Sequence, residues 1–230
     1  MDFLTNQYFL LALTFVIFTG AQQLQKRTGQ QLLNPILLTM MLMILFLLLF
    51  DIDYDTYKQG GTYIEFWLKP AVVALAIPLY RQLETIRKQL IPLLLAELAG
   101  CVAGIVSVVM LADLFGATRD VAVSLAAKSV TTPIAIEVTK TLGGIDALTA
   151  AVVVCVGIFG SMTGFRIMKL SHVKSPIAQG LSMGTAAHAV GTSAAMDVGA
   201  RYGAFSSLGL TLNGLLTSIL TPYVLMLMGY

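Results

Sequence analysis

The sequence predicts an all-α polytopic membrane protein, with about six transmembrane helices and two re-entrant or broken helical hairpins related by an inverted internal repeat. Three observations predict this fold. Hydrophobic residues make up 57% of the chain and charged residues only 11%. Apolar runs long enough to cross a bilayer recur along it, and two further apolar stretches are interrupted by proline, glycine and charged residues.

The apolar runs occupy residues 8–20, 32–50, 66–80, 90–112, 148–165 and 205–228. The third run is the weakest span because it is short and contains Pro70 and Pro78. The chain opens without a basic segment or a small-residue cleavage site, so we expect its first run to be a retained span. We expect a single integral membrane domain over 1–230, with four spans in 1–112 and two broken hairpins and two spans in 113–230.

The two interrupted stretches cover residues 119–142 and 176–202. Thr131-Thr132-Pro133 is predicted to break the first, because proline lacks a backbone donor and disfavours helix at the preceding residue. Gly191-Thr192-Ser193 is predicted to break the second. Non-helical backbone at membrane depth is tolerated only where it is buried in protein or lines a water-filled cavity.

A shift of 60 residues aligns 126–143 with 186–203. In this alignment Lys128 pairs with His188, and Glu137 pairs with Asp197. Each stretch then has a basic or titratable residue before its break and a carboxylate after it. We interpret the match as an internal repeat, although common small residues account for part of it.

The basic loops 21–31, 81–89 and 166–175 are expected to be cytoplasmic, since cytoplasmic loops are enriched in lysine and arginine. The third of these reaches the cytoplasm only if 119–142 enters and leaves on the outer side. The two stretches are therefore expected to be hairpins that enter from opposite faces, which makes the repeat inverted. Two broken spanning helices that cross each other are the structural alternative.

Half-helix ends, free amides and hydroxyls at two such tips would form a site for an anion, most simply a carboxylate. Lys128 would add a full positive charge, although a structural salt bridge to Glu137 or Asp197 is the alternative. The predicted substrate-binding residues are Lys128, Ser129, Thr131, Thr132, His188, Gly191, Thr192 and Ser193.

Glu137, Asp197 and His188 are the predicted proton-coupling or ion-coupling groups, because an ionisable residue in a membrane segment is by default a functional hypothesis. Structural pairing of the carboxylates and a satisfied structural histidine are the alternatives. Asn213 is a secondary candidate, with a helix-to-helix hydrogen bond as the favoured interpretation. Glu97 is interpreted as a structural or snorkelling carboxylate.

Two recurring patterns have simpler interpretations. Small residues four apart, in Ala96-xxx-Gly100-xxx-Gly104 and Gly160-xxx-Gly164, indicate close helix packing. Residues 180–184 fit G-x-S-x-G, but a hydrolase would need a strand, a sharp turn and a histidine last in order. We find no nucleotide-binding or metal-binding motif, so we expect no enzyme, no metal, no nucleic-acid partner and no cofactor beyond a coupling proton or sodium ion.

Three segments, KSVTTPIAIEVTKTLGG (128–144), KSPIAQGLSMGTAAHAVGTSAAMD (174–197) and GAFSSLGLTLNGLLTSILTP (203–222), resemble the LrgB/CidB family of bacterial membrane proteins. The resemblance extends to the plastidic glycolate/glycerate translocator, and it implies a multi-pass protein of the bacterial cytoplasmic (inner) membrane. It also implies two competing functions. One is an antiholin-like modulator of murein hydrolase export and autolysis, acting with a small LrgA/CidA-type membrane partner. The other is transport of small 2-oxo or 2-hydroxy monocarboxylates such as pyruvate, glycolate and glycerate.

The hairpin argument favours the second function. A holin-like protein needs oligomerisation, which small-residue helix faces can provide, and it has no need of paired polar hairpins. We therefore expect a secondary transporter of small organic anions with proton coupling, binding the carboxylate between the two broken tips. Further expectations are contact with membrane lipid and a homo-oligomer.

Overall fold

The computed structural model describes residues 3–28, 33–74 and 76–230, and all regular secondary structure in these ranges is helical. The chain forms two compact units, Met1–Ala74 (unit 1) and Leu75–Tyr230 (unit 2). The expectation of one domain over the whole chain stays a prediction.

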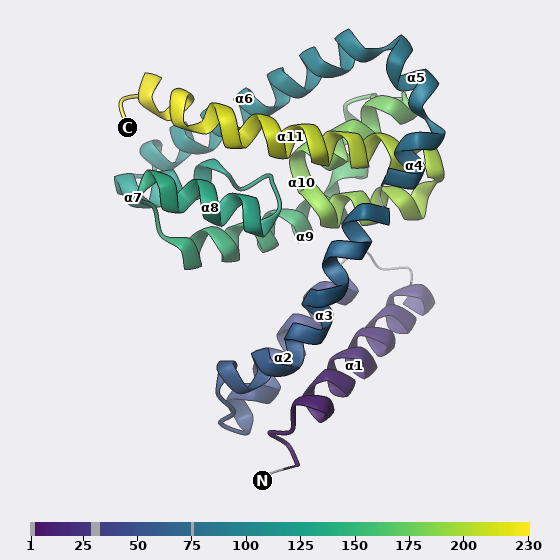
Figure 1. Cartoon of the computed structure of the whole chain (residues 1–230), viewed down its shortest axis with the longest axis vertical. Helices are drawn as coiled ribbons and strands as arrows, with labels where there is room; N and C mark the ends of the chain where they lie inside the picture. The colour runs from purple at the N-terminus through teal and green to yellow at the C-terminus, as the bar shows by residue number, and fades with distance from the viewer. Residues whose placement is uncertain (1–2, 29–32, 75) are drawn as a thin grey trace. The chain divides into compact units, whose positions relative to one another are not determined.

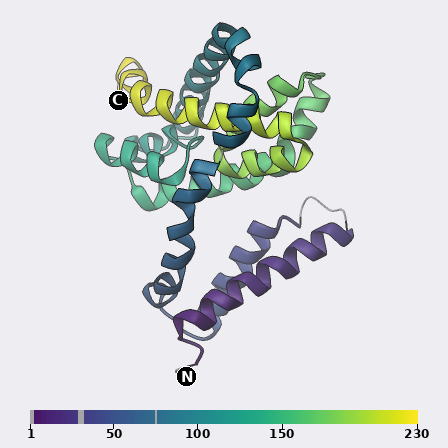
Figure 2. The same cartoon turned by 45° about the vertical axis from the view of Figure 1, so that its right-hand side comes forward.

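The described residues of unit 1 form the helices α1 (Gln7–Thr28), α2 (Pro35–Leu49) and α3 (Tyr54–Ala74), drawn in purple to blue in Figures 1 and 2. Helix α1 packs against both α2 and α3. The start of α2 is defined by its sequence: Asn34 Oδ1 accepts the backbone N–H of Ile36 at 2.9 Å, and Pro35 occupies the first helical position.

Unit 2 contains α4 (Ala76–Arg81), α5 (Leu83–Lys88), α6 (Leu90–Leu114), α7 (Arg119–Ala126), α8 (Thr132–Leu142), α9 (Asp146–Leu170), α10 (Pro176–Val198) and α11 (Ala200–Leu227). In Figure 1, α6, α9 and α11 run along the unit, while α7 and α8 lie toward one end and α10 toward the other. We call these the first end and the second end.

At the first end, the last turn of α6 lies beside the C-terminus of the chain. The Tyr230 hydroxyl donates a hydrogen bond to Asp113, and this bond raises the pKa of Tyr230. Val109 of α6 packs there with Val123 of α7 and Leu225 of α11. Helices α6 and α11 therefore both end at the first end of unit 2.

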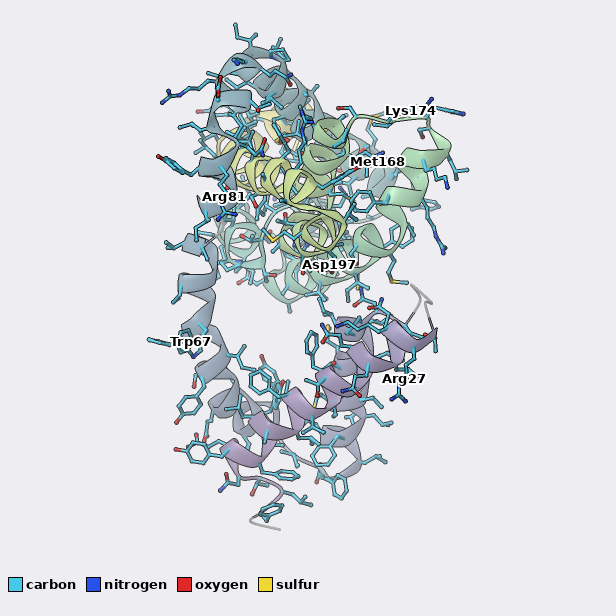
Figure 3. The ribbon with its side chains drawn as sticks, turned by 90° about the vertical axis from the view of Figure 1, so that its right-hand side faces the viewer. Arg27, Trp67, Arg81, Met168, Lys174 and Asp197 are labelled. Atoms are coloured by element: carbon cyan, nitrogen blue, oxygen red, sulfur yellow. The ribbon has the colours of Figure 1, made fainter. Side chains whose placement is uncertain are left out.

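The second end gathers the start of α6 and the start of α11. Ile86 and Leu93 pack with Leu181 and Phe205 in one buried cluster. Figure 3 views unit 2 from this side and labels Arg81, Met168 and Lys174 on it. Residues 81–89 and 166–175 thus lie at the same end of unit 2, as a common membrane face for these two basic segments requires.

The first interrupted stretch forms a hairpin. Helix α7 ends at Ala126, residues 127–131 are non-helical, and α8 begins at Thr132. The backbone N–H of Ile145, just beyond α8, donates to Ser124 Oγ in α7 at 2.7 Å. Both arms therefore reach the first end, and the predicted break at residues 131–133 falls at the boundary where α8 begins.

The second interrupted stretch also folds back, but its break is not where the sequence predicts it. Helical geometry is lost at Ala187 and at His188, which has φ 41° and ψ −136°. A Cβ at Gly191 would lie 2.5 Å from the carbonyl oxygen of Met183, and Met183 packs with Ala195. The two arms of α10 are thus in contact on either side of the break.

The prediction of a break at Gly191-Thr192-Ser193 is wrong. These residues continue the helix, and Thr192 Oγ1 donates to the carbonyl oxygen of His188 at 2.9 Å within it. Gly191 serves close packing, because any side chain there would meet the other arm. The real break falls at the positions that the 60-residue shift pairs with Ala127 and Lys128.

Within the part of the chain that the structure describes, four helices are long and apolar enough to cross a membrane: α1, α6, α9 and α11. Helix α2, with 15 residues, is apolar but shorter. The predicted span 66–80 is divided between the end of α3 and α4, and neither helix is long and apolar enough to cross a membrane. The structure therefore supports a multi-pass protein with several apolar helices, and the count of six spans stays a prediction.

The three basic segments are predicted to be loops, but much of each one is helical. Residues 21–28 belong to the end of α1, whereas 29–31 lie outside the described residues. Residues 83–88 form α5, and Arg166 and Lys169 lie in α9. Their cytoplasmic placement stays a prediction.

Candidate functional site

A cavity of about 290 Å³ lies where α6, the break after α7 and the first arm of α10 meet. Each of these three elements contributes a polar or charged group to it. Its lining residues are Ala96, Glu97, Gly100, Gly104, Lys128, Ser129, Leu181, Ser182, Thr185 and Ala186. The cavity thus joins the two broken stretches across a face of α6.

Glycines on α6 provide the space for this cavity. A Cβ at Gly104 would meet no atom within 4 Å, whereas one at Gly100 would lie 3.1 Å from Thr185 Cγ2. The close packing that Ala96-xxx-Gly100-xxx-Gly104 predicts therefore holds at Gly100, whereas Gly104 borders the cavity without a close neighbour. At Gly160 and Gly164 of α9 the packing interpretation holds, because added side chains would meet Ala187 and Met183 of α10.

Lys128 lies in the non-helical segment after α7 and is half-buried. Its Nζ donates to Ser129 Oγ at 3.1 Å. The ion pairs found in the described ranges are Lys88–Glu84 and Lys140–Asp146, so Lys128 is not paired with Glu137 or Asp197. The alternative of a structural salt bridge at Lys128 is therefore wrong.

Glu137 and Asp197 both lie on exposed surfaces and do not line the cavity. Glu137 instead borders a separate groove of about 470 Å³ between α8 and α11. Asp197 lies near the end of α10 and is labelled in Figure 3. The structure thus keeps both predicted coupling carboxylates apart from Lys128.

Glu97 is the buried carboxyl group of the cavity, with 0% of its surface exposed. Its Oε1 accepts a hydrogen bond from Thr185 Oγ1 at 2.5 Å. Its Oε2 has no hydrogen-bond partner among the residues that the structure describes. Because the side chain is sealed inside the protein, the snorkelling interpretation is wrong.

Asn213 of α11 connects the two broken stretches. Its Nδ2 donates to the carbonyl oxygen of Ser129 at 3.2 Å and to that of Thr185 at 2.9 Å. The predicted helix-to-helix hydrogen bond is confirmed, and it joins the segment after α7 to the first arm of α10. The residue is 1% exposed, so these bonds are shielded from water.

His188 is buried at the break of α10 and faces away from the cavity lining. Its Nε2 lies 2.9 Å from the carbonyl oxygen of Val153 in α9, which requires the Nε2–H tautomer for a hydrogen bond. A Cβ at Gly157 would lie 2.5 Å from His188 Cε1, so the ring fills the space above that glycine. The ring is thus held against α9 by one hydrogen bond and by packing, and its role in coupling or binding stays a prediction.

The remaining predicted binding residues also lie off the cavity. Thr131 and Thr132 are half-buried at the start of α8, and Gly191 is buried between the arms of α10. Thr192 is hydrogen-bonded to Ser206 Oγ at 2.9 Å, and Ser193 is exposed. Of the eight predicted substrate-binding residues, the structure brings Lys128 and Ser129 to the cavity.

Sequence reasoning missed Ser182 and Thr185, which line the cavity from the first arm of α10. The two are three residues apart and therefore share a helix face, just before the break. Polar residues at this spacing in an otherwise apolar helix are a usable signal for a lined cavity.

A second, more apolar groove of about 660 Å³ lies between α9 and α10. It shares Lys128, Ser182 and Ala186 with the cavity. It continues along α9 to Met168, which lies at the second end of unit 2 (Figure 3). Lys128 therefore stands between a small polar cavity and a groove that leads toward one end.

Comparison with known proteins identifies the family. Residues 14–227 match the LrgB-like family. The chain is 35% identical over 218 residues to the holin-like protein CidB of Staphylococcus epidermidis, with 95% of each chain covered. It is 36% identical over 218 residues to the uncharacterized protein YxaC of Bacillus subtilis, again with 95% of each covered. An uncharacterized protein of Haemophilus influenzae is 37% identical over 228 residues, covering 98% of this chain and 99% of that one.

No solved structure matches the chain. The matched segment includes every helix of unit 2 and most of unit 1, so the relationship concerns the whole architecture and not one motif. The resemblance carried by segments 128–144, 174–197 and 203–222 is thereby confirmed. The chain belongs to the LrgB-like family of membrane proteins.

Proposed function

We propose that the protein is a secondary transporter of small monocarboxylates, 2-oxo or 2-hydroxy acids such as pyruvate, glycolate and glycerate. One observation carries this proposal: Lys128, a lysine without an ion pair in the described structure, lines a cavity that also contains hydroxyl groups of Ser129, Ser182 and Thr185. An ammonium group with several hydroxyl donors is suited to a carboxylate.

The size of the cavity supports a small substrate. Its volume of about 290 Å³ lies at the lower bound, about 300 Å³, of typical small-molecule sites. A two-carbon or three-carbon acid fits such a space, and the glycine-lined wall on α6 limits it on one side. The substrate carboxylate would bind Lys128, and its 2-oxo or 2-hydroxy oxygen would face the hydroxyl groups.

The arrangement of the helices supports alternating access. The arms of the first hairpin begin and end at the first end of unit 2, and those of α10 at the second. In the proposal these are re-entrant hairpins of an inverted repeat, in a protein with six spans and with 21–31, 81–89 and 166–175 in the cytoplasm. The groove from Lys128 to Met168 would then be the cytoplasmic access route.

Transport of a monoanion into the cell needs a driving ion. Moving one negative charge against 100 mV costs about 2.3 kcal/mol, which one co-transported proton or sodium ion offsets. The sequence assigns this role to Glu137, Asp197 or His188, and these assignments are tested by neutral substitutions at each position.

A second function, an antiholin-like modulator of murein hydrolase export and autolysis, is favoured by one observation: the similar proteins of Staphylococcus epidermidis and Staphylococcus aureus are called holin-like. In that case a small LrgA/CidA-type membrane protein would be the partner, and oligomers would perturb the bilayer. Such a function makes no use of a lysine-lined cavity.

Uptake into proteoliposomes distinguishes the two. Labelled pyruvate, glycolate or glycerate is offered under an inward proton gradient, with and without the small partner, to wild type and to Lys128→Ala. We expect saturable accumulation in wild type and a loss of about 100-fold in the variant, since charged hydrogen bonds contribute up to about 3 kcal/mol. Lys140→Ala is the matched control, because Lys140 is an exposed lysine on α8 with one long ion pair.

Two outcomes would decide against the carrier. Equal uptake in wild type and Lys128→Ala would remove the cavity from the mechanism. Absence of saturable uptake together with leakage of an encapsulated dye would favour the holin-like function.

A further inference from the structure

The carboxyl group of Glu97 is sealed in the cavity with an unusual hydrogen-bond environment. It is 0% exposed, one oxygen accepts from Thr185 at 2.5 Å, and the other has no partner among the described residues. A charged carboxylate normally accepts several hydrogen bonds. With a single hydroxyl donor, the charged form of Glu97 depends on a nearby cation, and otherwise the side chain must carry a proton.

The groups around Glu97 leave one candidate cation. On α6 itself the nearest titratable group is the buried Cys101 thiol, which lies 3.4 Å from Thr217 Oγ1. Helix α11 presents Gly209, where a Cβ would lie 3.0 Å from Glu97 Oε1, and α10 presents Thr185. Among the described residues that line the cavity, Lys128 is the only cation.

We propose that Glu97 binds the proton that is transported with the substrate, an inference that rests on the proposed carrier function. In the empty cavity the Lys128 ammonium balances the Glu97 carboxylate. When a substrate carboxylate binds Lys128, the cavity holds two anions and one cation, and a proton on Glu97 Oε2 restores the balance. One monoanion and one proton then cross together, and no net charge moves.

The hydrogen bond to Thr185 connects this protonation to the second hairpin. Thr185 Oγ1 also lies 2.8 Å from the carbonyl oxygen of Leu181, to which it can donate instead. A charged Glu97 competes for that hydrogen, whereas a protonated one competes less strongly. The proton on Glu97 therefore changes how tightly the first arm of α10 is held to α6.

The test compares substrate exchange with gradient-driven accumulation in proteoliposomes, using glycolate as the probe. Glu97→Gln keeps an acceptor for Thr185 and a similar volume, but it cannot release a proton. We expect accumulation to fall at least about tenfold more than exchange does, the size of a typical coupling between two sites. Glu97→Asp keeps a carboxyl group and is expected to restore part of the accumulation. Glu84→Gln, at an exposed glutamate on α5, is the matched control.

The outcomes separate the two proposals. No exchange in wild type would overturn the carrier function itself. Exchange in wild type with normal accumulation in Glu97→Gln would overturn only the role of Glu97. The same conclusion would follow if Glu137→Gln or Asp197→Asn lost accumulation while Glu97→Gln kept it.

A second variant covers the case in which Glu97→Gln does not fold. Thr185→Val removes the hydroxyl that stabilises the charged carboxylate, so the pH at which accumulation is half-maximal is expected to move upward. An unchanged pH profile would contradict the proposal.

Discussion

The two breaks in unit 2 occupy equivalent positions and have different surroundings. The 60-residue shift pairs Ala127 and Lys128 with Ala187 and His188, and both pairs interrupt a helix. After the first break the chain stays non-helical to residue 131, whereas after the second the helix resumes at once. The comparison teaches that a repeat can place two breaks in register while leaving their side chains free to differ.

The side chains at the two breaks show this difference. Lys128 lines a cavity, and its side chain makes one hydrogen bond within the described residues, to its neighbour Ser129. His188 is hydrogen-bonded to the carbonyl oxygen of Val153, and its ring packs on Gly157. One break therefore borders a cavity, and the other is held against α9.

The largest effect on stability is expected at the second break. His188→Ala removes the side-chain donor to the carbonyl oxygen of Val153 and empties the space above Gly157, which together should cost about 3 kcal/mol. Thermal unfolding in detergent measures this loss. Normal stability combined with lost transport would instead assign His188 to the substrate site, and it would contradict the distinction drawn between the two breaks.

A smaller loss of stability is expected from Gly191→Ala. The added methyl group would lie 2.5 Å from the carbonyl oxygen of Met183, so the two arms of α10 must separate, at a cost of about 2 kcal/mol. The same unfolding assay applies, with Gly104→Ala as the reference. A neutral result would mean that the two arms are not closed against each other.

The smallest effect is expected from Gly104→Ala itself. No atom lies within 4 Å of the new Cβ and alanine favours a helix more than glycine does, so stability should equal that of wild type or exceed it by up to about 1 kcal/mol. The methyl group borders the cavity, so uptake of glycerate should fall by a few-fold more than uptake of the smaller glycolate. Equal effects on the two acids would place the substrate elsewhere.

Much of the fold could be predicted because it depends on local chemistry. Hydropathy indicates the apolar helices, and Pro133 marks the start of α8. The second break could not be placed, since Gly191 gives the same local signal whether it ends a helix or allows another arm to approach. Only the packing of Met183 against it decides between these roles.

The candidate site was predictable to a smaller extent. Lys128 stands out as a charge beside a helix break, and it does line the cavity. Glu97 resembles many interfacial glutamates in sequence, and its burial arises from distant parts of the chain, Thr185 of α10 (88 residues later) and Gly209 of α11. Ser182 and Thr185 face the cavity only because the first arm of α10 packs against α6.

The amide group of Asn213 has a kinetic consequence. Its two N–H bonds point to carbonyl oxygens of Ser129 and Thr185, which belong to different hairpins. Covalent geometry thus sets how far apart the two tips can be, as a rigid spacer would. Any movement that separates the tips must first break one of these bonds, at about 1 kcal/mol, a barrier that thermal motion crosses readily. The spacer defines one resting distance and still permits many openings in each second.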